Sequence, residues 1–223
     1  MSTKRSKRYQ EAAKLVTPNK NYSITEAVET MKSFPAPKFD PTVTVSFHLT
    51  VDPRKSDQMV RGSVSLPNGT GKNVRVLVFA QGDAAKAAQE AGAEFVGFED
   101  LIKKVQGGFV DFDTAIATPD AMTEVRKVAR VLGPRGLMPN PKTGTVTDDT
   151  AKAVKEVKAG RVDYKVDKNA NISAAVGKLS FSNESIAENI AALIDSVVYI
   201  ESVTVSCAMC PGLPVDTASI AKL

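Results

Sequence analysis

The chain of 223 residues contains little of what enzymes commonly use for catalysis, with one histidine and two cysteines. The histidine, His48, lies within an alternating strand-like stretch rather than beside other reactive side chains. A catalytic triad or a metal cluster normally requires more His or Cys partners than these. The composition therefore predicts a protein that is not an enzyme and that holds no metal or cofactor.

Long apolar runs are also missing. The longest, VLVFA (76–80) and IAALI (190–194), are far shorter than the roughly 20 residues needed to cross a bilayer. The basic amino terminus MSTKRSKRYQEAAK is not followed by the apolar stretch of an export signal. We therefore expect no membrane contact and a cytoplasmic location, where thiols stay reduced.

The glycine-rich loops that hold nucleotides are incomplete. GTGK (69–72) resembles a phosphate loop, but Leu66 stands where that motif needs glycine and Asn73 where it needs Ser or Thr. A dinucleotide fingerprint would follow the strand at 74–80, and only Gly82 lies near that turn. The sequence gives no nucleotide site.

The middle of the chain alternates strand-like and helix-like stretches. VRVLVFA (74–80) is a continuous apolar run typical of a strand buried on both faces, and the alanine-rich DAAKAAQEAGA after it favours a helix. The alternation repeats through EFVGF, EDLIKKVQ, DTAIATP and DAMTEVRKVARVL. This order predicts a Rossmann-like α/β domain with a parallel sheet.

The flanking regions have a different pattern. Residues 42–51, 161–167 and 201–208 alternate with period two, as half-buried antiparallel strands do. A capping box from Ser23 to Glu26 predicts one helix, and apolar spacing predicts another over roughly 184–197. We therefore predict a discontinuous α+β outer domain, residues 1–67 and 160–223, with the α/β domain 68–159 inserted. The links LPNGTGK (66–72) and KAGR (158–161) contain glycine and would permit a hinge motion.

Charge and aromatic placement point to a polyanion. The first 67 residues carry eleven basic and six acidic side chains, whereas residues 160–223 carry five and seven. A solvated face is one interpretation of this basic excess, and a nucleic-acid surface is the other. Phe39, beside Lys38, is either a core residue or an RNA contact, because bases stack on aromatic rings while lysine meets phosphate.

The acidic pairs and one proline-rich segment also have competing interpretations. The acidic pairs Asp111/Asp113 and Asp148/Asp149 are interpreted as turn and helix-start residues rather than acid/base pairs. The segment LGPRGLMPNPKTGTV (132–146) is predicted to be an ordered loop that either closes its domain or contacts a partner.

The Cys-x-x-Cys spacing of Cys207 and Cys210 raises the alternative of a thiol switch or redox protein. Pro211, Gly212 and Pro214 oppose the helix that usually follows such a motif, and strand alternation predicts that Cys207 is half-buried and inert.

Several motifs, in order, resemble the bacterial ribosomal protein L-one family. They are KFDPTVTV (38–45), DPRKSDQMVRGSVSLPNGTGK (52–72), FDTAIATPD (112–120), VRKVARVLGPRGLMPNPKTGTV (125–146), KAGRVDYKVDK (158–168) and VGKLSF (176–181). The resemblance implies a large-subunit ribosomal protein, monomeric when free, whose outer domain binds ribosomal RNA to form the mobile stalk near the transfer RNA exit site. It also implies contact with exit-site transfer RNA and repression of its own messenger RNA.

The resemblance also implies site residues and marks departures. The matching RNA-binding positions are Lys38, Phe39, Thr42, Arg161, Asp167, Lys168, Ser202, Ala208, Met209 and Cys210. Ala208 lacks the hydroxyl group of the family's threonine. Cys210 replaces a glycine, so a special backbone angle is in question there, and His48 stands where lysine is common. The connector within IDSVVYIES (194–202) is shorter than the family's Lys-Pro and Gly-rich one, through loss of that loop or absence of a segment.

Overall fold

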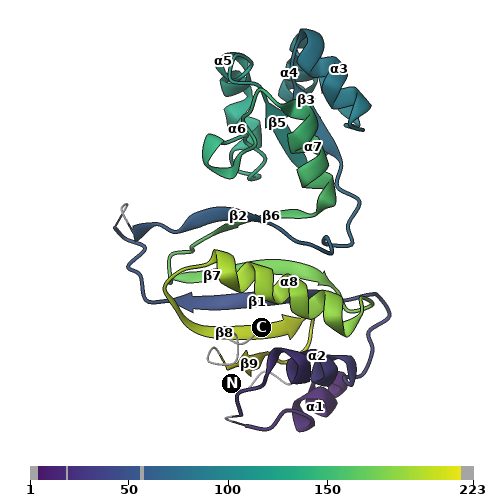
Figure 1. Cartoon of the computed structure of the whole chain (residues 1–223), viewed down its shortest axis with the longest axis vertical. Coiled ribbons are helices and arrows are strands. Elements are labelled where there is room, and N and C mark those ends of the chain that lie inside the picture. The colour runs from purple at the N-terminus through teal and green to yellow at the C-terminus, as the bar shows by residue number, and fades with distance from the viewer. Residues whose placement is uncertain (1–4, 19, 56–57, 217–223) are drawn as a thin grey trace. The chain divides into compact units, whose positions relative to one another are not determined.

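The computed structural model describes residues 5–18, 20–55 and 58–216. The chain forms two compact units (Figure 1). The outer unit comprises Met1–Gly71 and Val162–Leu223, and the middle unit comprises Lys72–Arg161. Division into domains at 67/68 and 159/160 stays a prediction.

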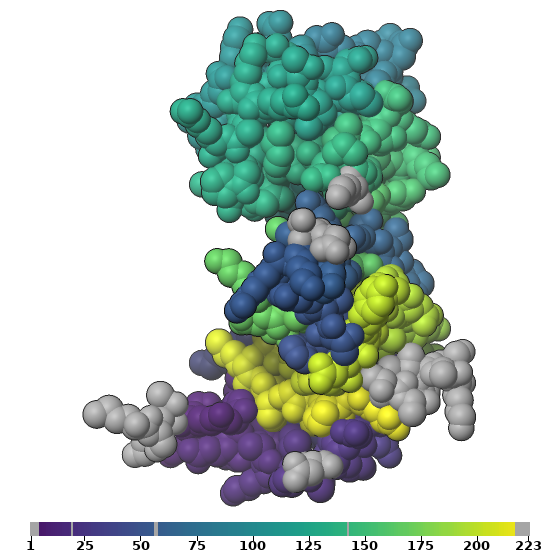
Figure 2. All heavy atoms as spheres, turned by 90° about the vertical axis from the view of Figure 1, so that its left-hand side faces the viewer, coloured from purple at the N-terminus to yellow at the C-terminus, as the bar shows by residue number. Residues whose placement is uncertain are grey.

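The outer unit contains a four-stranded antiparallel sheet in the order β7-β1-β8-β9. Its strands are β1 (Thr42–Leu49), β7 (Asn171–Lys178), β8 (Ile200–Cys207) and β9 (Leu213–Val215). Segments from the two flanks of the chain meet here, because the Tyr22 N–H donates to Pro214 O at 2.9 Å and the Asp216 N–H donates to Tyr22 O at 3.0 Å. Figure 2 shows the purple N-terminal and yellow C-terminal parts on one surface of this unit.

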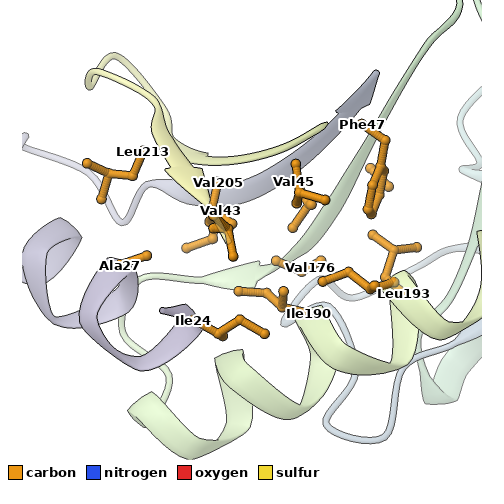
Figure 3. Packing of buried hydrophobic residues seen from close by; sticks show 14 of the residues in the cluster. Ile24, Ala27, Val43, Val45, Phe47, Val176, Ile190, Leu193, Val205 and Leu213 are labelled. Atoms are coloured by element: carbon orange, nitrogen blue, oxygen red, sulfur yellow. The ribbon is translucent and has the colours of Figure 1, made fainter. Parts of the chain in front are cut away.

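Helices cover one face of this sheet. They are α2 (Ile24–Lys32) and α8 (Asn183–Ser196), and α1 (Lys7–Lys14) precedes them in the same unit. The predicted capping box of Ser23 and Glu26 is present at the start of α2. Every second residue of β1 is buried, and Figure 3 shows Val43, Val45 and Phe47 directed toward Ile190 and Leu193 of α8. Burial of these side chains on one face supplies the core of the outer unit.

A two-stranded sheet of β2 (Arg61–Ser65) and β6 (Arg161–Lys165) is also present. The chain after β2 is fixed to α8 by Asn189, a buried polar side chain. Its Nδ2 donates to Val176 O at 2.7 Å and to Gly69 O at 3.0 Å, and its Oδ1 accepts from the Asn68 N–H at 3.1 Å. A buried amide with several partners holds this segment in one position.

The middle unit contains a parallel sheet in the order β4-β3-β5, as the alternating pattern predicted. Its strands are β3 (Val76–Phe79), β4 (Phe95–Gly97) and β5 (Thr114–Ala117). Leu77 and Phe79 pack in a cluster with α4 (Glu99–Gln106), whereas Val76 and Val78 pack in a cluster with α3 (Gly82–Glu90) and α7 (Thr150–Ala159). Side chains therefore cover both faces of β3.

The stretch 120–132, predicted as one helix, is divided into three short segments. These are α5 (Met122–Val125), the 3₁₀ turn η2 (Arg126–Val128) and α6 (Ala129–Leu132). Val125 and Val128 are both fully buried. Because residues three apart eclipse in a 3₁₀ turn, this geometry directs both valines into the core. The following segment is ordered, with the turn η3 (Pro141–Thr143) and with Leu137 and Met138 packed on the core.

Candidate RNA-binding surface

The second face of the outer sheet carries mainly polar side chains, whereas apolar side chains fill the first. Thr44 and Ser46 of β1 lie opposite Ser206 and Thr204 of β8 in the sheet register. On the other side, Ser46 lies opposite Ser173 of β7, and their hydroxyl oxygens are 3.0 Å apart. Hydroxyl groups both donate and accept hydrogen bonds, which suits the phosphate and ribose oxygens of a nucleic acid.

The loop after β8 lies at one end of this face. The Ala208 N–H donates to Thr42 O at 3.1 Å, and the Cys210 N–H donates to Cys207 O at 3.0 Å. Met209, between them, has φ 64° and an exposure of 70%. A left-handed backbone is unusual for a residue with a long side chain. The turn therefore holds Met209 in an uncommon conformation, with its side chain directed outward.

The strip that precedes β1 meets this loop at the hydrogen bond between Ala208 and Thr42. Asp40 fixes the strip, because its carboxylate accepts from the Ser180 N–H at 3.2 Å and from the Ser180 hydroxyl at 2.8 Å. Lys178 Nζ donates to the Thr42 hydroxyl at 3.3 Å. Lys38 and Phe39 are exposed, Phe39 to 48%. Phe39 is therefore a surface aromatic and not the core residue of the alternative interpretation.

The opposite end of the face holds a second group of predicted residues. Ser202 is exposed and lies opposite His48. The His48 imidazole lies 2.8 Å from Asn171 Oδ1 through Nδ1 and 3.5 Å from Glu201 through Nε2. Asp167 and Lys168 are exposed in the turn that leads into Asn171. Ser202, Asp167 and Lys168 thus lie apart from the Thr42 end of the face.

Asp167 organises its own turn. Its carboxylate accepts from the Asn171 and Asn169 N–H groups, each at 2.8 Å. These bonds, that of Asn171 first, hold the pKa of Asp167 below its ordinary value. The carboxylate is therefore ionised and already engaged in the turn, and a contact from it to RNA stays a prediction.

Residues 29–211 match the ribosomal protein L1p/L10e family. The chain belongs to this family. A large ribosomal subunit protein uL1 of Bifidobacterium animalis subsp. lactis is 55% identical over 227 residues, which cover 97% of this chain and 99% of that protein. The corresponding protein of Corynebacterium kroppenstedtii is 54% identical over 228 residues, 98% of this chain and 96% of that protein.

A third relative, the large ribosomal subunit protein uL1 of Corynebacterium glutamicum (strain R), is 52% identical and covers 96% of this chain. Membership in the L1p/L10e family confirms the predicted large-subunit ribosomal character and the cytoplasmic ribosomal location. The relatives are ribosomal proteins, a structural family without enzymatic activity. Within the described residues, no helix is long and apolar enough to span a membrane.

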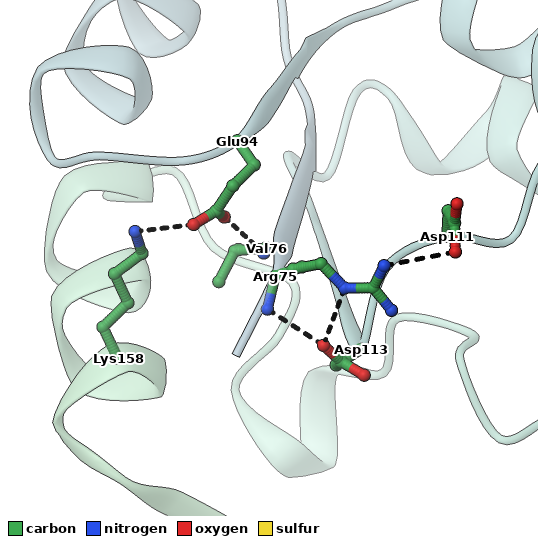
Figure 4. Close-up of polar contacts among 6 residues, drawn as sticks. All are labelled: Arg75, Val76, Glu94, Asp111, Asp113 and Lys158. Carbon is green, nitrogen blue, oxygen red and sulfur yellow. Dashed lines mark hydrogen bonds and ion pairs between the residues drawn. The ribbon is translucent and has the colours of Figure 1, made fainter. Parts of the chain in front are cut away.

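Three carboxylates of the acidic pairs, those of Asp111, Asp113 and Asp149, have structural partners. Arg75 donates to Asp113 through its backbone N–H at 3.0 Å and its Nε at 3.3 Å, and to Asp111 through Nη1 at 3.1 Å (Figure 4). Asp149 accepts from the Lys152 N–H at the start of α7. These carboxylates fasten strand and helix starts rather than flank a reacting group.

Arg161 is the last residue of the middle unit and is held by contacts within that unit. Its Nη1 donates to Glu156 at 3.1 Å, and its Nη2 donates to Thr143 O. Its side chain is only 12% exposed. A contact between this arginine and RNA stays a prediction, and its observed contacts hold the 132–146 loop against α7.

The two cysteines occupy a turn followed by β9, not a helix. Cys207 is 3% exposed, more deeply buried than the half-buried position that strand alternation predicted, because its side of β8 faces the core. Burial, and next the neighbouring Cys210, raise the pKa of Cys207 to about 12. Cys210 itself is absent from the residues with positive φ. In this chain the left-handed angle belongs to Met209, so position 210 does not need glycine for its backbone.

The shortened connector is a three-residue link. Val197, Val198 and Tyr199 join α8 to β8, and Tyr199 has φ 62°. Its carbonyl accepts from the Thr50 N–H at 3.0 Å. This bond holds a bulky residue in a backbone region that it seldom adopts.

Some residues of the surface were missing from the sequence prediction. The hydroxyl side chains of β1 and β8 could have been found, because TVTVSFH and VTVSC place them on alternate positions. Arg8 belongs to the basic amino-terminal stretch, which suits a polyanion, but nothing local predicts its contact with the loop after β8. Its Nη2 donates to Met209 O at 3.3 Å across 201 positions of sequence, and only the fold brings the two together.

Proposed function

We propose that the outer unit binds a folded region of large-subunit ribosomal RNA directly, and that protein and RNA together form the mobile stalk near the transfer RNA exit site. The observation that carries this proposal is the hydrogen bond from Ala208 to Thr42. It joins the strip with Lys38 and Phe39 to the loop with Met209, at the end of an open hydroxyl face. Membership in a ribosomal family supports the same assignment.

Each residue of the proposed surface suits a different group of the RNA. Lys38 supplies a cation for phosphate, and Phe39 supplies a ring on which an unpaired base stacks. Met209 offers a soft apolar surface beside it. Thr42, Thr44 and the facing hydroxyls accept and donate to sugar and phosphate groups. Ser202 and Lys168 extend the contact to the other end of the sheet.

Two further roles follow from the same surface. An RNA fold of similar shape in the protein's own messenger RNA would occupy the same residues, so free protein would repress its own translation only when ribosomal RNA is saturated. Exit-site transfer RNA is a third partner, reached once the stalk is assembled. The protein is monomeric until it binds RNA.

The test is binding of the full-length protein to the stalk fragment of large-subunit ribosomal RNA, against a scrambled RNA of equal length, at two salt concentrations. Tight binding of the stalk fragment that survives the higher salt is expected, because base stacking and hydrogen bonds persist when phosphate contacts are screened. Binding that is equal for both RNAs and lost at the higher salt would contradict the proposal.

Single substitutions then locate the surface. Phe39→Ala and Met209→Ala are each expected to weaken stalk RNA binding roughly five- to hundredfold, the value of one stacked base. Met59→Ala is the matched control, because Met59 is exposed to 48%, as Phe39 is, but lies outside the proposed contact. Unchanged affinity of both test variants, in folded protein, would remove these residues from the interface.

A further inference from the structure

The turn that carries Met209 is closed by two cysteines. The Cys210 N–H donates to Cys207 O at 3.0 Å, the bond of a four-residue β-turn. Such a turn brings its end Cα atoms within about 7 Å, and disulfides span Cα separations up to about 6.8 Å. The Cys207 side chain lies in the outer core and the Cys210 side chain packs against it. The backbone already has the span that a disulfide needs.

A cation lies beside this pair. Arg8 donates from Nη2 to Met209 O at 3.3 Å. Its positive charge favours the thiolate form of Cys207 only slightly, and burial outweighs it, so the pKa of Cys207 stays raised. The second nitrogen, Nη1, is buried with no hydrogen-bond partner among the described residues. A buried guanidinium N–H without a partner is rare, and a nearby anion would satisfy it. A thiolate formed at Cys210, the residue that follows Met209, would be such an anion.

The two thiols have different access. Cys207 is 3% exposed and is held as the neutral thiol by burial, whereas Cys210 is only partly buried. A small oxidant in solution therefore meets Cys210 first. Cys207, on the buried side of the turn, is then the thiol that can react with the oxidised Cys210.

We infer that Cys207 and Cys210 form a reversible disulfide across this turn, and that the disulfide weakens RNA binding by the same loop. The second half rests on the RNA-binding function proposed above. The site is a redox modification site for a peroxide.

The chemistry balances in two steps. The Cys210 thiolate attacks one oxygen of hydrogen peroxide, which forms a sulfenic acid and releases hydroxide that takes up a proton to become water. The Cys207 sulfur then attacks the Cys210 sulfur and expels the sulfenic hydroxyl, which leaves with the Cys207 proton as a second water. Two thiols lose two electrons to the peroxide, and a dithiol reductant reverses the change.

The bond would alter the loop that Met209 occupies. Sulfur atoms in a disulfide are about 2.05 Å apart, closer than two separate thiols in van der Waals contact. Because Met209 lies between the cysteines at φ 64°, drawing them together turns its side chain and shifts the Ala208 N–H away from Thr42 O. The disulfide would therefore strain the hydrogen bond that joins the strip before β1 to the loop after β8.

The experiment treats full-length protein with hydrogen peroxide and follows intact mass, free thiols and stalk RNA binding before treatment, after it and after dithiothreitol. We expect the loss of two hydrogens, no free thiol, about tenfold weaker RNA binding and full recovery on reduction. Cys207→Ala and Cys210→Ala each remove the disulfide and are expected to bind RNA equally before treatment and after treatment followed by dithiothreitol. Arg8→Gln is expected to slow disulfide formation.

The outcomes separate the two proposals. If the reduced protein does not select stalk RNA, the RNA-binding function fails, while the mass and thiol measurements still report on the disulfide. Two thiols that stay free, or a higher oxide of Cys210 without a disulfide, overturn the redox inference. A disulfide that forms and leaves RNA affinity unchanged overturns its regulatory half.

Discussion

The two sheets of this protein differ in what their faces carry. In the middle unit all four residues of β3 are buried, and helices pack on both sides. In the outer unit β1 alternates buried and accessible residues, because helices pack on one side only. A strand that is apolar throughout has no face left for a partner. The open, hydroxyl-bearing face of the outer sheet leaves side chains accessible to a ligand.

The largest predicted effect tests this difference directly. Leu77→Ala and Ile116→Ala lie in clusters on opposite faces of the middle sheet, and each should lower the free energy of unfolding by about 2–5 kcal/mol. In the outer sheet Leu49→Ala should cost a similar amount, while Thr44→Ala should change stability by no more than about 0.5 kcal/mol. Urea denaturation of the full-length variants measures these values. Equal losses at Leu49 and Thr44 would contradict a one-sided core.

An intermediate effect concerns RNA affinity. Thr44→Val and Ser46→Ala remove hydroxyls from the open face and should each weaken stalk RNA binding by about 1 kcal/mol, with stability nearly unchanged. The matched control is Thr114→Val in β5 of the middle unit, which should bind RNA as the unaltered protein does. The comparison between the two sheets fails if the control loses as much affinity as the test variants.

The smallest predicted effect is a pH dependence of the middle unit. Burial alone would raise the pKa of Glu94, but hydrogen bonds from the Val76 N–H at 2.7 Å and Lys158 at 2.9 Å outweigh it and lower the pKa (Figure 4). The Arg75 N–H, first among its contacts, lowers the pKa of Asp113.

Because these folded-state values lie below the ordinary 4.5 and 3.8, the stabilisation is present above those ordinary values and is lost as pH falls through the folded-state pKa values. Glu94→Gln with Asp113→Asn should flatten the loss of stability between about pH 5 and pH 3. Thermal unfolding at a series of pH values measures the slope. If stability falls with pH as steeply in this variant as in the unaltered protein, other carboxylates cause the loss of stability in acid.

Much of this fold could be predicted from local patterns. The capping box at Ser23, the continuous apolar run of β3 and the alternation of β1 each report a single element, and each was found. The division of 120–132 into three segments could not be predicted, because it depends on how Val125 and Val128 meet a core that only the folded unit provides.

Part of the candidate site could be predicted from the sequence. Phe39 beside Lys38 carried a chemical signal of its own, and the family resemblance supplied Met209. The junction of Thr42 with Ala208, the depth of Cys207 and the approach of Arg8 to Met209 arise from contacts between distant parts of the chain. No local pattern encodes such contacts.

The most direct test of the central claim is hydrogen–deuterium exchange of the full-length protein, free and bound to the stalk fragment of ribosomal RNA. The account predicts slower exchange on binding in residues 38–49 and 200–212, with exchange in β3, β4 and β5 unchanged. Protection confined to the middle unit, with none in the strip before β1 or the loop after β8, would contradict it.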